Sequence, residues 1–373
     1  MNEMNEWQET KWGEIATLEY GKSLRGYQEK TSGFRVYGTN GPIGWHDEYL
    51  CDQPGVIIGR KGAYRGVHYS PTPFFVIDTA FYLNPKTEID IRWAYYALLL
   101  CDINNMDSGS AIPSTSRADF YNLPVTIPPL AVQRRIAEIL GALDDKIANN
   151  AAINHHLEQI AQAIYEQKFG MQNDLVTPIS EIVDIRDGTH DSPKAVDSGY
   201  PLVTSKHLLP YGVDVITPNL ICQADFDKIN ERSKVDTHDI LISMIGTIGL
   251  ISLVIEREVN FAIKNVGLFK TSQIKEFVYY VLCFLRSPAM RDHIDIRLAG
   301  STQKFISLGE LRQLPIAVPS KEELHGFNDI VRPMFDEIEL RTVESAHLAA
   351  IRDALLPRLM SGELPIVDIS NIK

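Results

Sequence analysis

One short loop combines the side chains that proteins use to contact nucleic acids. Gly59-Arg60-Lys61-Gly62-Ala63-Tyr64-Arg65-Gly66 follows an apolar run and places three cations and an aromatic ring between glycines. Glycines let a backbone come close to a phosphate, and an arginine can donate two hydrogen bonds to a guanine edge. We therefore predict that Arg60, Lys61 and Arg65 contact DNA. The alternative is a glycine turn whose charges are only solvated.

The second half of the chain holds a further set of candidate DNA contacts. Asparagine, lysine and arginine near serine or threonine are the side chains that base and phosphate recognition uses. The residues of this set are Lys206, His207, Lys264, Asn265, Arg297 and Lys304. For each of them the alternative interpretation is an ordinary solvated surface residue.

Three motifs resemble chemical signatures but lack an essential part. Gly21-Lys22-Ser23 ends like a phosphate-binding loop, yet Ala16 stands where the first glycine of that loop belongs. Glu166-Gln167-Lys168 has a nuclease-like spacing without the upstream acidic partner. His155 and His156 are adjacent, so on a helix they point in different directions and cannot bind one metal together. With no methyltransferase, nuclease or catalytic-triad signature, we predict a binding role without catalytic residues, cofactor or metal in this chain.

The elements that must position these residues occur twice along the chain. The matching positions are Gly21 and Gly188, 167 residues apart, Gly62 and Gly246, 184 apart, and Leu123-Pro124 and Leu314-Pro315, 191 apart. Because the offset grows through the middle, the second copy has gained insertions there. The sequence therefore predicts an internal pseudo-two-fold repeat.

Each copy begins with a region of mixed α/β character. Short apolar, β-branched runs such as 56–58 and 239–242 are bounded by turn residues, which is typical of buried strands. Helical patterns follow these runs in both copies. The predicted fold class is therefore α+β, with two similar globular α/β domains at residues 1–129 and 171–319.

Each copy ends in a proline-rich segment followed by a strongly periodic one. Apolar residues recur at alternating steps of three and four, a spacing typical of a helix packed along another helix. The predicted seam positions are Ile136, Leu140, Leu143, Ile147 and Leu157, and in the second copy Ile338, Leu348 and Leu355. Both seams become polar near residues 150–154 and 341–345, which fixes register at some cost in stability. We predict a coiled-coil spacer of two long antiparallel helices, at residues 130–170 and 320–373.

Composition indicates a globular protein of a reducing compartment. No stretch approaches the ~18 apolar residues of a membrane helix. The N-terminal residues are acidic where a signal peptide is basic. The four cysteines are scattered without the paired spacing of disulfides or zinc sites. We therefore expect a cytoplasmic protein without a membrane partner.

The acidic balance of the chain limits how it could bind DNA. The formal net charge is −12, and neither globular region is net basic. The acidic balance therefore disfavours a whole domain that binds DNA by phosphate neutralisation alone. DNA contacts would have to come from local patches, such as the loop at 59–66, or be completed by a basic partner subunit.

The start of the first helical region resembles the central part of type I restriction–modification specificity subunits. The similar residues are Ile127-Pro128-Pro129-Leu130-Ala131-Val132-Gln133-Arg134-Arg135-Ile136-Ala137-Glu138-Ile139-Leu140 and Leu143-Asp144-Asp145-Lys146-Ile147. The C-terminal Leu355-Leu356-Pro357-Arg358-Leu359-Met360-Ser361-Gly362-Glu363-Leu364 is similar to the closing motif of that family. The second copy departs from the pattern, because Val318-Pro319-Ser320-Lys321-Glu322-Glu323 lacks the second proline and the Gln-Arg-Arg run.

The resemblance implies a non-catalytic subunit that directs a larger complex to DNA. Two target recognition domains would each recognise one half of an asymmetric, bipartite site in double-stranded DNA, through the middle of each domain where the copies differ most. The helices would be a spacer and a dock for two modification (methyltransferase) subunits. Those partners would bind S-adenosylmethionine, and restriction subunits would join them to cleave unmodified DNA. Two alternatives stay open: a specificity partner of a fused methyltransferase–nuclease, and a coiled-coil scaffold that does not bind DNA.

Overall fold

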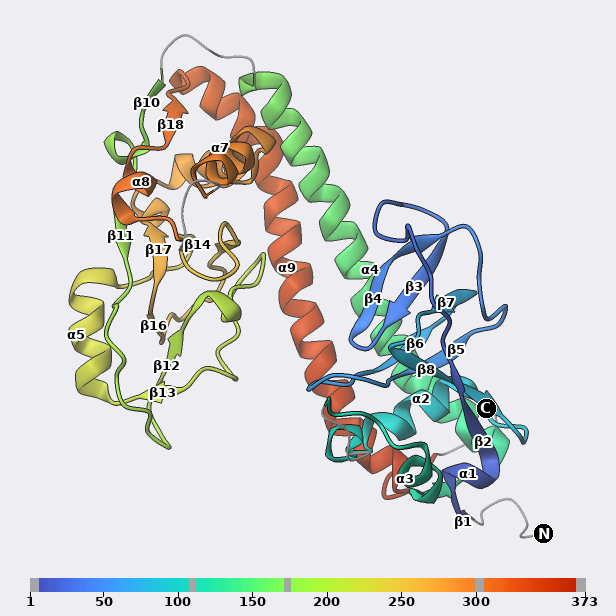
Figure 1. Ribbon diagram of the computed structural model, residues 1–373. Coiled ribbons are helices and arrows are strands. Elements are labelled where there is room, and N and C mark those ends of the chain that lie inside the picture. Colours follow the sequence, from blue (N-terminus) through green and yellow to red (C-terminus); the bar gives the residue numbers. More distant parts are fainter. Residues whose placement is uncertain (1–6, 107–111, 171–175, 299–304, 367–373) are drawn as a thin grey trace, which may run out of the picture. The chain divides into compact units, whose positions relative to one another are not determined.

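The computed structural model describes residues 7–106, 112–170, 176–298 and 305–366 (Figure 1). The chain divides into two compact units, and both have parts far apart in the sequence. Unit 1 comprises Met1–Ala148 and Ala346–Lys373, and unit 2 comprises Asn149–Ser345. Each unit thus contains a globular region together with part of both long helices. The helices are shared between the units, whereas the sequence predicted them as separate segments.

Unit 1 is built around a four-stranded antiparallel sheet in the order β2-β8-β5-β6 (Figure 1). A mixed sheet has the order β4-β3-β7, and β1 pairs with β9. The strands are β1 (Gln8–Lys11), β2 (Ala16–Tyr20), β3 (Phe34–Gly38), β4 (Gly41–His46), β5 (Gly55–Gly59), β6 (Val67–Ser70), β7 (Phe74–Val76), β8 (Ala80–Pro85) and β9 (Pro124–Ile127). The helices are α1 (Trp12–Ile15), α2 (Ile91–Leu99) and α3 (Arg117–Asn122).

Strand β5 is buried on both faces, which explains its uninterrupted apolar sequence. Val56 and Ile58 pack in the core that contains Trp93 of α2. Ile57 belongs to a second core, together with Phe74 of β7. Successive side chains of a strand point to opposite faces, so a strand covered on both faces is apolar throughout.

Unit 2 repeats this arrangement strand for strand. Its sheets have the orders β11-β17-β14-β15 and β13-β12-β16, and β10 pairs with β18. The strands are β10 (Val176–Pro178), β11 (Ile185–Asp187), β12 (Tyr200–Val203), β13 (Leu220–Ile221), β14 (Ile240–Ser243), β15 (Ile251–Leu253), β16 (Ala262–Ile263), β17 (Val266–Phe269) and β18 (Pro315–Ala317). The helices are α5 (Gln223–Ser233), α6 (Val278–Arg286), α7 (Pro288–Leu298) and α8 (Leu308–Arg312). The matching topology confirms the predicted internal repeat.

The drifting offset between the copies has a structural explanation. Residues 39–40 join β3 to β4, whereas residues 204–219 join the equivalent strands β12 and β13. The connection from β4 to β5 is the loop 47–54, but in unit 2 helix α5 lies in the equivalent connection. Both insertions belong to the middle of the second copy, where the sequence offset grows.

Each copy ends in a 40-residue helix, α4 (Leu130–Phe169) or α9 (Lys321–Met360). Hydrogen bonds between the two helices show that they run antiparallel, because the residue numbers on α9 fall as those on α4 rise. The bonded pairs are Asp144 with Arg352 in unit 1, and Asn150 with Ser345 and Asn154 with Thr342 in unit 2. The predicted antiparallel spacer is therefore confirmed.

The predicted seam positions are all at least partly buried. Ile136, Leu140 and Ile338 are fully buried, and each belongs to the hydrophobic core of its own unit. The half-buried positions are Leu143, Ile147, Leu157, Leu348 and Leu355. Full burial thus occurs where the helix pair also packs on a globular core.

The polar part of the seam lies in unit 2. Asn150 is fully buried, accepts a hydrogen bond from Arg341 at 3.1 Å and donates one to Ser345 at 3.2 Å. Asn154 donates to Thr342 at 3.2 Å. A buried amide between two helices is satisfied in only one axial alignment, so these contacts favour a single register.

Candidate nucleic-acid interface

In both units, the glycine that follows the first strand of the four-stranded sheet makes the same backbone hydrogen bond. The amide of Gly21 donates to the carbonyl of Ala80 at 3.2 Å, and the equivalent Gly188 donates to Val266 at 2.9 Å. A Cβ atom at Gly21 would lie 2.1 Å from the carbonyl oxygen of Ile77, so only glycine permits this approach. The glycine that suggested a nucleotide loop therefore has a structural role.

Two threonines hold the glycine loop of unit 1. The hydroxyl of Thr39 lies 2.8 Å from the carbonyl oxygen of Lys61 and 2.7 Å from that of Thr79. The hydroxyl of Thr115 donates to the carbonyl of Gly59 at 2.7 Å. These bonds hold the loop backbone in one conformation. A loop that is already ordered binds a ligand without the entropic cost of ordering it.

The three cations of this loop lie in different surroundings. Lys61 is exposed, and Arg60 is half-buried, with its guanidinium 4.8 Å from the ring centre of Tyr20 and a 2.9 Å hydrogen bond to the carbonyl of Asp78. Arg65 is only 3% exposed. A DNA contact remains a prediction for Arg60 and Lys61.

The structure does not support a DNA contact for Arg65, because its side chain points into unit 1. Its guanidinium donates to the carbonyl oxygens of Asn104 at 2.6 Å and Met106 at 2.8 Å. The loop passes through Gly62, whose φ is +123°, before it reaches Arg65. Both bonds come from Nη2 and offset part of the cost of burying the charge, whereas Nε and Nη1 have no hydrogen-bond partner among the described residues.

Sequence reasoning missed Arg117, which lies beside the same loop. Its guanidinium is 5.2 Å from the ring centre of Tyr20 and donates to the hydroxyl of Tyr121 at 2.8 Å. Tyr20 is 48% exposed, so Arg60 and Arg117 flank a ring that solvent can reach. Cations beside an exposed aromatic ring suit both phosphates and stacked bases. No local signal joins these residues, since three separate segments contribute them.

In unit 2 the structure brings three of the predicted residues together. Lys206, Lys264 and Asn265 line one concavity of about 410 Å³. Its other lining residues are Thr204, Ser205, Ile245, Gly246, Thr247 and Leu250. Lys206 is exposed, whereas the ammonium of Lys264 donates to the hydroxyl of Ser192 at 2.6 Å. The concavity therefore combines cations, an amide and hydroxyl groups with exposed apolar side chains.

A polar network that sequence reasoning did not find extends from this concavity. The amide oxygen of Asn265 lies 2.7 Å from Nδ1 of His190, whose Nε2 lies 3.0 Å from Asp187. Arg232 of α5 forms an ion pair with the same carboxylate at 3.1 Å. The network holds the turn of Asn265, whose φ of +54° is left-handed. It links the inserted helix α5 to the concavity.

The structure does not support a DNA contact for His207 either. Its side chain is 3% exposed, and its Nδ1 accepts a hydrogen bond from the backbone of Thr204 at 2.9 Å. Burial lowers the pKa of this imidazole, which keeps it neutral. His207 therefore supports the loop that presents Lys206. Arg297 lies in α7, but its side chain is outside the described residues, and so is Lys304.

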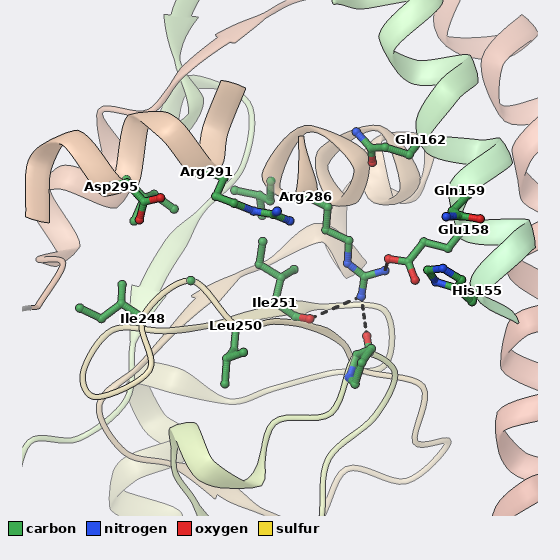
Figure 2. Close-up of a pocket in the computed structure, with 14 residues that line it drawn as sticks. His155, Glu158, Gln159, Gln162, Ile248, Leu250, Ile251, Arg286, Arg291 and Asp295 are labelled. Atoms are coloured by element: carbon green, nitrogen blue, oxygen red, sulfur yellow. Dashed lines mark hydrogen bonds and ion pairs between the residues drawn. The ribbon is translucent and has the colours of Figure 1, made fainter. Parts of the chain in front are cut away.

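A second cavity of unit 2, of about 560 Å³, lies between α4, α6, α7 and the loop before β15 (Figure 2). Arg286 extends along it and is held by Glu158 at 2.7 Å and by the carbonyl of Pro210 at 2.6 Å. Its charge is neutralised by a residue of α4, so this arginine ties the globular region to the helix. We assign the cavity no ligand.

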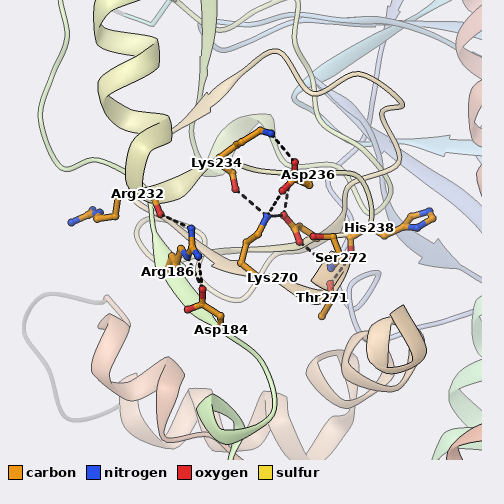
Figure 3. Close-up of polar contacts among 10 residues, drawn as sticks. Asp184, Arg186, Arg232, Lys234, Asp236, His238, Lys270, Thr271 and Ser272 are labelled. Atoms are coloured by element: carbon orange, nitrogen blue, oxygen red, sulfur yellow. Dashed lines mark hydrogen bonds and ion pairs between the residues drawn. The ribbon is translucent and has the colours of Figure 1, made fainter. Parts of the chain in front are cut away.

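Figure 3 shows Lys270 of unit 2 beside the carboxylate of Asp236, in a buried ion pair that stabilises the neighbouring turn. Lys270 is 2% exposed and donates to the carboxylates of Asp239 and Asp236. This holds the turn that contains His238, with a φ of +68°, and places its imidazole 3.2 Å from Glu339 of α9. The carboxylate of Glu339 raises the pKa of His238.

Two classes of site have no counterpart in the part of the chain that the structure describes. Among those residues, no group of histidine, cysteine, aspartate and glutamate side chains is arranged to hold a metal ion. His155 and His156, with ring centres 6.0 Å apart, form no such group. None of the described helices is both long and apolar enough to span a bilayer.

Comparison with known proteins yields one family. A family model described as type I restriction modification DNA specificity domain matches residues 4–159 and 177–348. The chain is 23% identical over 320 residues to the type I restriction enzyme MjaIX specificity subunit of Methanocaldococcus jannaschii, covering 76% of this chain and 72% of that protein. It is 24% identical over 385 residues to the HindI specificity subunit of Haemophilus influenzae, covering 78% and 81%.

One solved structure has the same fold. The crystal structure of the type I restriction–modification system S subunit from M. genitalium superposes with a TM-score of 0.58 at 18% identity. The match covers 96% of this chain and 97% of that chain. The likeness therefore includes both copies of the repeat.

Proposed function

This chain belongs to the type I restriction–modification DNA specificity family, and from that premise we propose that it is the non-catalytic subunit that gives such a complex its sequence specificity. The observation that carries the proposal is the pair of units with one topology but different side chains at equivalent loops. Two identical units would recognise a palindrome, because the symmetry of a site mirrors that of the protein. Two divergent units suit an asymmetric, bipartite site.

Contacts with double-stranded DNA would come from the two loop clusters. In unit 1, the guanidinium groups of Arg60 and Arg117 lie beside the ring of Tyr20, and Lys61 is exposed in the same loop as Arg60. In unit 2, Lys206, Lys264 and Asn265 line a single concavity. Lysines suit phosphates, whereas arginine and asparagine can form paired hydrogen bonds with guanine and adenine.

The long helices would dock two modification subunits, one for each copy of the repeat, and restriction subunits would join that complex. Several apolar side chains of the helices are more than 40% exposed, which suits a surface that a protein partner covers. These residues are Ile160, Ile330, Leu340, Val343 and Ile351. The modification subunits would bind S-adenosylmethionine and supply much of the phosphate contact that an acidic chain cannot. The relatives described above are named specificity subunits, which supports neither a fused-enzyme partner nor a scaffold that does not bind DNA.

The test is reconstitution of the complex. The full chain is purified with its modification subunit, and the recognised sequence is mapped by methylation-sensitive sequencing. We expect the complex to bind a duplex with that sequence about 10³-fold more tightly than a scrambled duplex, at two salt concentrations. Equal affinity for the two duplexes would overturn the proposal.

A further inference from the structure

Lys61 of unit 1 and Ile245 of unit 2 occupy the same position of the repeated fold. Each precedes the glycine with positive φ, Gly62 or Gly246, in the loop after the equivalent strand. Each also forms an isolated antiparallel bridge to the segment before the last short helix of its unit, Lys61 with Ser114 and Ile245 with Phe305. The backbone pairing is thus equivalent in the two units, while the side chain changes from a cation to an aliphatic group.

Hydrogen bonds around the two residues confirm the equivalence. In unit 1 the amide of Thr115 donates to the carbonyl of Arg60 at 2.9 Å. In unit 2 the amide of Ile306 donates to the carbonyl of Met244 at 3.0 Å. These two bonds join the residues that precede Lys61 and Ile245 to the residues that follow their bridge partners.

The loop that presents Ile245 is held in one conformation. Ser243 is fully buried. Its carbonyl accepts a hydrogen bond from the amide of Gly249 at 3.1 Å, and its hydroxyl accepts one from the amide of Leu250 at 2.8 Å. Its own hydroxyl donates to the carbonyl of Thr247 at 2.5 Å. Binding would therefore not require the loop to be ordered first.

Ile245 is exposed among polar groups that already suit DNA. It is 45% exposed and lines the concavity of Lys206, Lys264 and Asn265. An aliphatic side chain forms no hydrogen bond with a phosphate or a base edge, so its favourable contacts are with apolar groups. The apolar group that a base presents in the major groove is the 5-methyl of thymine.

We propose that position 61/245 determines specificity differently in the two units, and that Ile245 recognises the methyl group of a thymine in the half-site bound by unit 2. The inference rests on the proposed function, because it requires sequence-specific binding of duplex DNA. Lys61, at the same position in unit 1, offers a hydrogen-bond donor in place of an apolar contact.

Replacing thymine by uracil tests this contact, since uracil lacks only the methyl group. With the purified complex and a duplex of the mapped site, each thymine is replaced in turn. We expect one replacement, in one half-site, to weaken binding about 3- to 10-fold. Ile245→Ala should weaken binding to the thymine duplex by a similar factor. The complex with this variant should bind the thymine duplex and the uracil duplex with equal affinity. Ile245→Val should keep part of the difference.

Two controls make the outcomes separable. Lys61→Ala should leave the effect of uracil unchanged, because its contact lies in the other unit. Unchanged melting of Ile245→Ala would exclude misfolding. Sequence-specific binding in which no thymine is sensitive to uracil, or in which Ile245→Ala keeps the full difference, would overturn this inference alone. A wild-type complex that does not prefer its mapped site would overturn the proposed function and this inference with it.

Discussion

Arg60 and Arg65 lie five residues apart in one loop, yet only Arg60 is near the protein surface. The guanidinium of Arg60 rests on the exposed ring of Tyr20, whereas that of Arg65 donates to two backbone carbonyls inside unit 1. Removing a buried charged donor leaves its acceptors without partners, which costs more than removing a solvated charge. The residues of this loop should therefore separate into those that bind and those that stabilise.

Variants of Lys61 and Arg65 should separate these two roles. We expect Arg65→Met to lower the free energy of unfolding by about 2 kcal/mol, because the carbonyls of Asn104 and Met106 lose their donor. Lys61→Ala should leave stability unchanged and weaken DNA binding by the complex about tenfold. Chemical denaturation and a binding titration measure the two effects. A destabilised Lys61→Ala, or an Arg65→Met of full stability, would contradict this assignment.

We expect His238 to make the stability of unit 2 depend on pH. Glu339 raises the pKa of this imidazole, with Asp336 adding to the effect, whereas burial and Lys275 oppose it. A raised pKa in the folded state contributes stability below the unfolded pKa of about 6.5, and the contribution is lost as pH rises through the folded value. The melting temperature of the wild type should therefore exceed that of Glu339→Gln by more at pH 6 than at pH 8.5. His238→Gln is the matched control, and the same margin at both pH values would contradict the prediction.

At the scale of elements, the two long helices act as one pair. Their hydrogen-bonded residues have numbers that sum to an almost constant value, as with Asp144 and Arg352 or Asn150 and Ser345. A change in the length of one helix alone must therefore shift this register. Because Asn150 is fully buried, a shift would leave its amide without partners.

Shortening both helices together should preserve the register. Deleting residues 143–149 with residues 346–352 removes one heptad from each helix at facing positions, and about 10 Å of helix length. We expect the complex to keep both half-sites but to recognise a spacer about 3 base pairs shorter. Deleting 143–149 alone should lower the melting temperature and abolish specific binding. Methylation mapping measures the spacer, and an unchanged spacer in the double deletion would contradict the role of these helices.

At the scale of the whole molecule, each unit has its own sheets and its own hydrophobic core. The two sets of recognition loops are therefore supported by separate cores. A unit that folds around its own core can diverge without disturbing the other. This is how one chain can recognise two unrelated half-sites.

Exchange of one globular region should therefore change one half-site. If residues 1–125 are replaced by the matching segment of a relative with a known site, we expect that half-site to follow the donor. The other half-site should stay unchanged, since the second core is not altered. Methylation-sensitive sequencing of cells that carry the chimaera gives both half-sites. A change in both would show that the units do not recognise DNA independently.

The sequence by itself determined the repeat, the strand-forming runs and the pairing of the two helices. These features follow from periodicity and spacing along the chain, and both can be read from the linear sequence. The polar seam at Asn150 is an example, because its place in the heptads already predicted a contact with the other helix. The glycine matches also predicted equivalent loops, and the offset of 184 would have identified Ile245 as the counterpart of Lys61.

Only the tertiary structure decided which polar side chains of those loops face solvent. Arg65 is buried because its partners, Asn104 and Met106, lie about forty residues away in sequence but adjacent in space. Lys206 and Lys264 meet in one concavity for the same reason. The direction of a loop side chain depends on neighbours that only folding brings together. Spacing along the sequence therefore predicted where the loops lie. It did not predict which of their side chains face solvent, because that depends on contacts made in the folded chain.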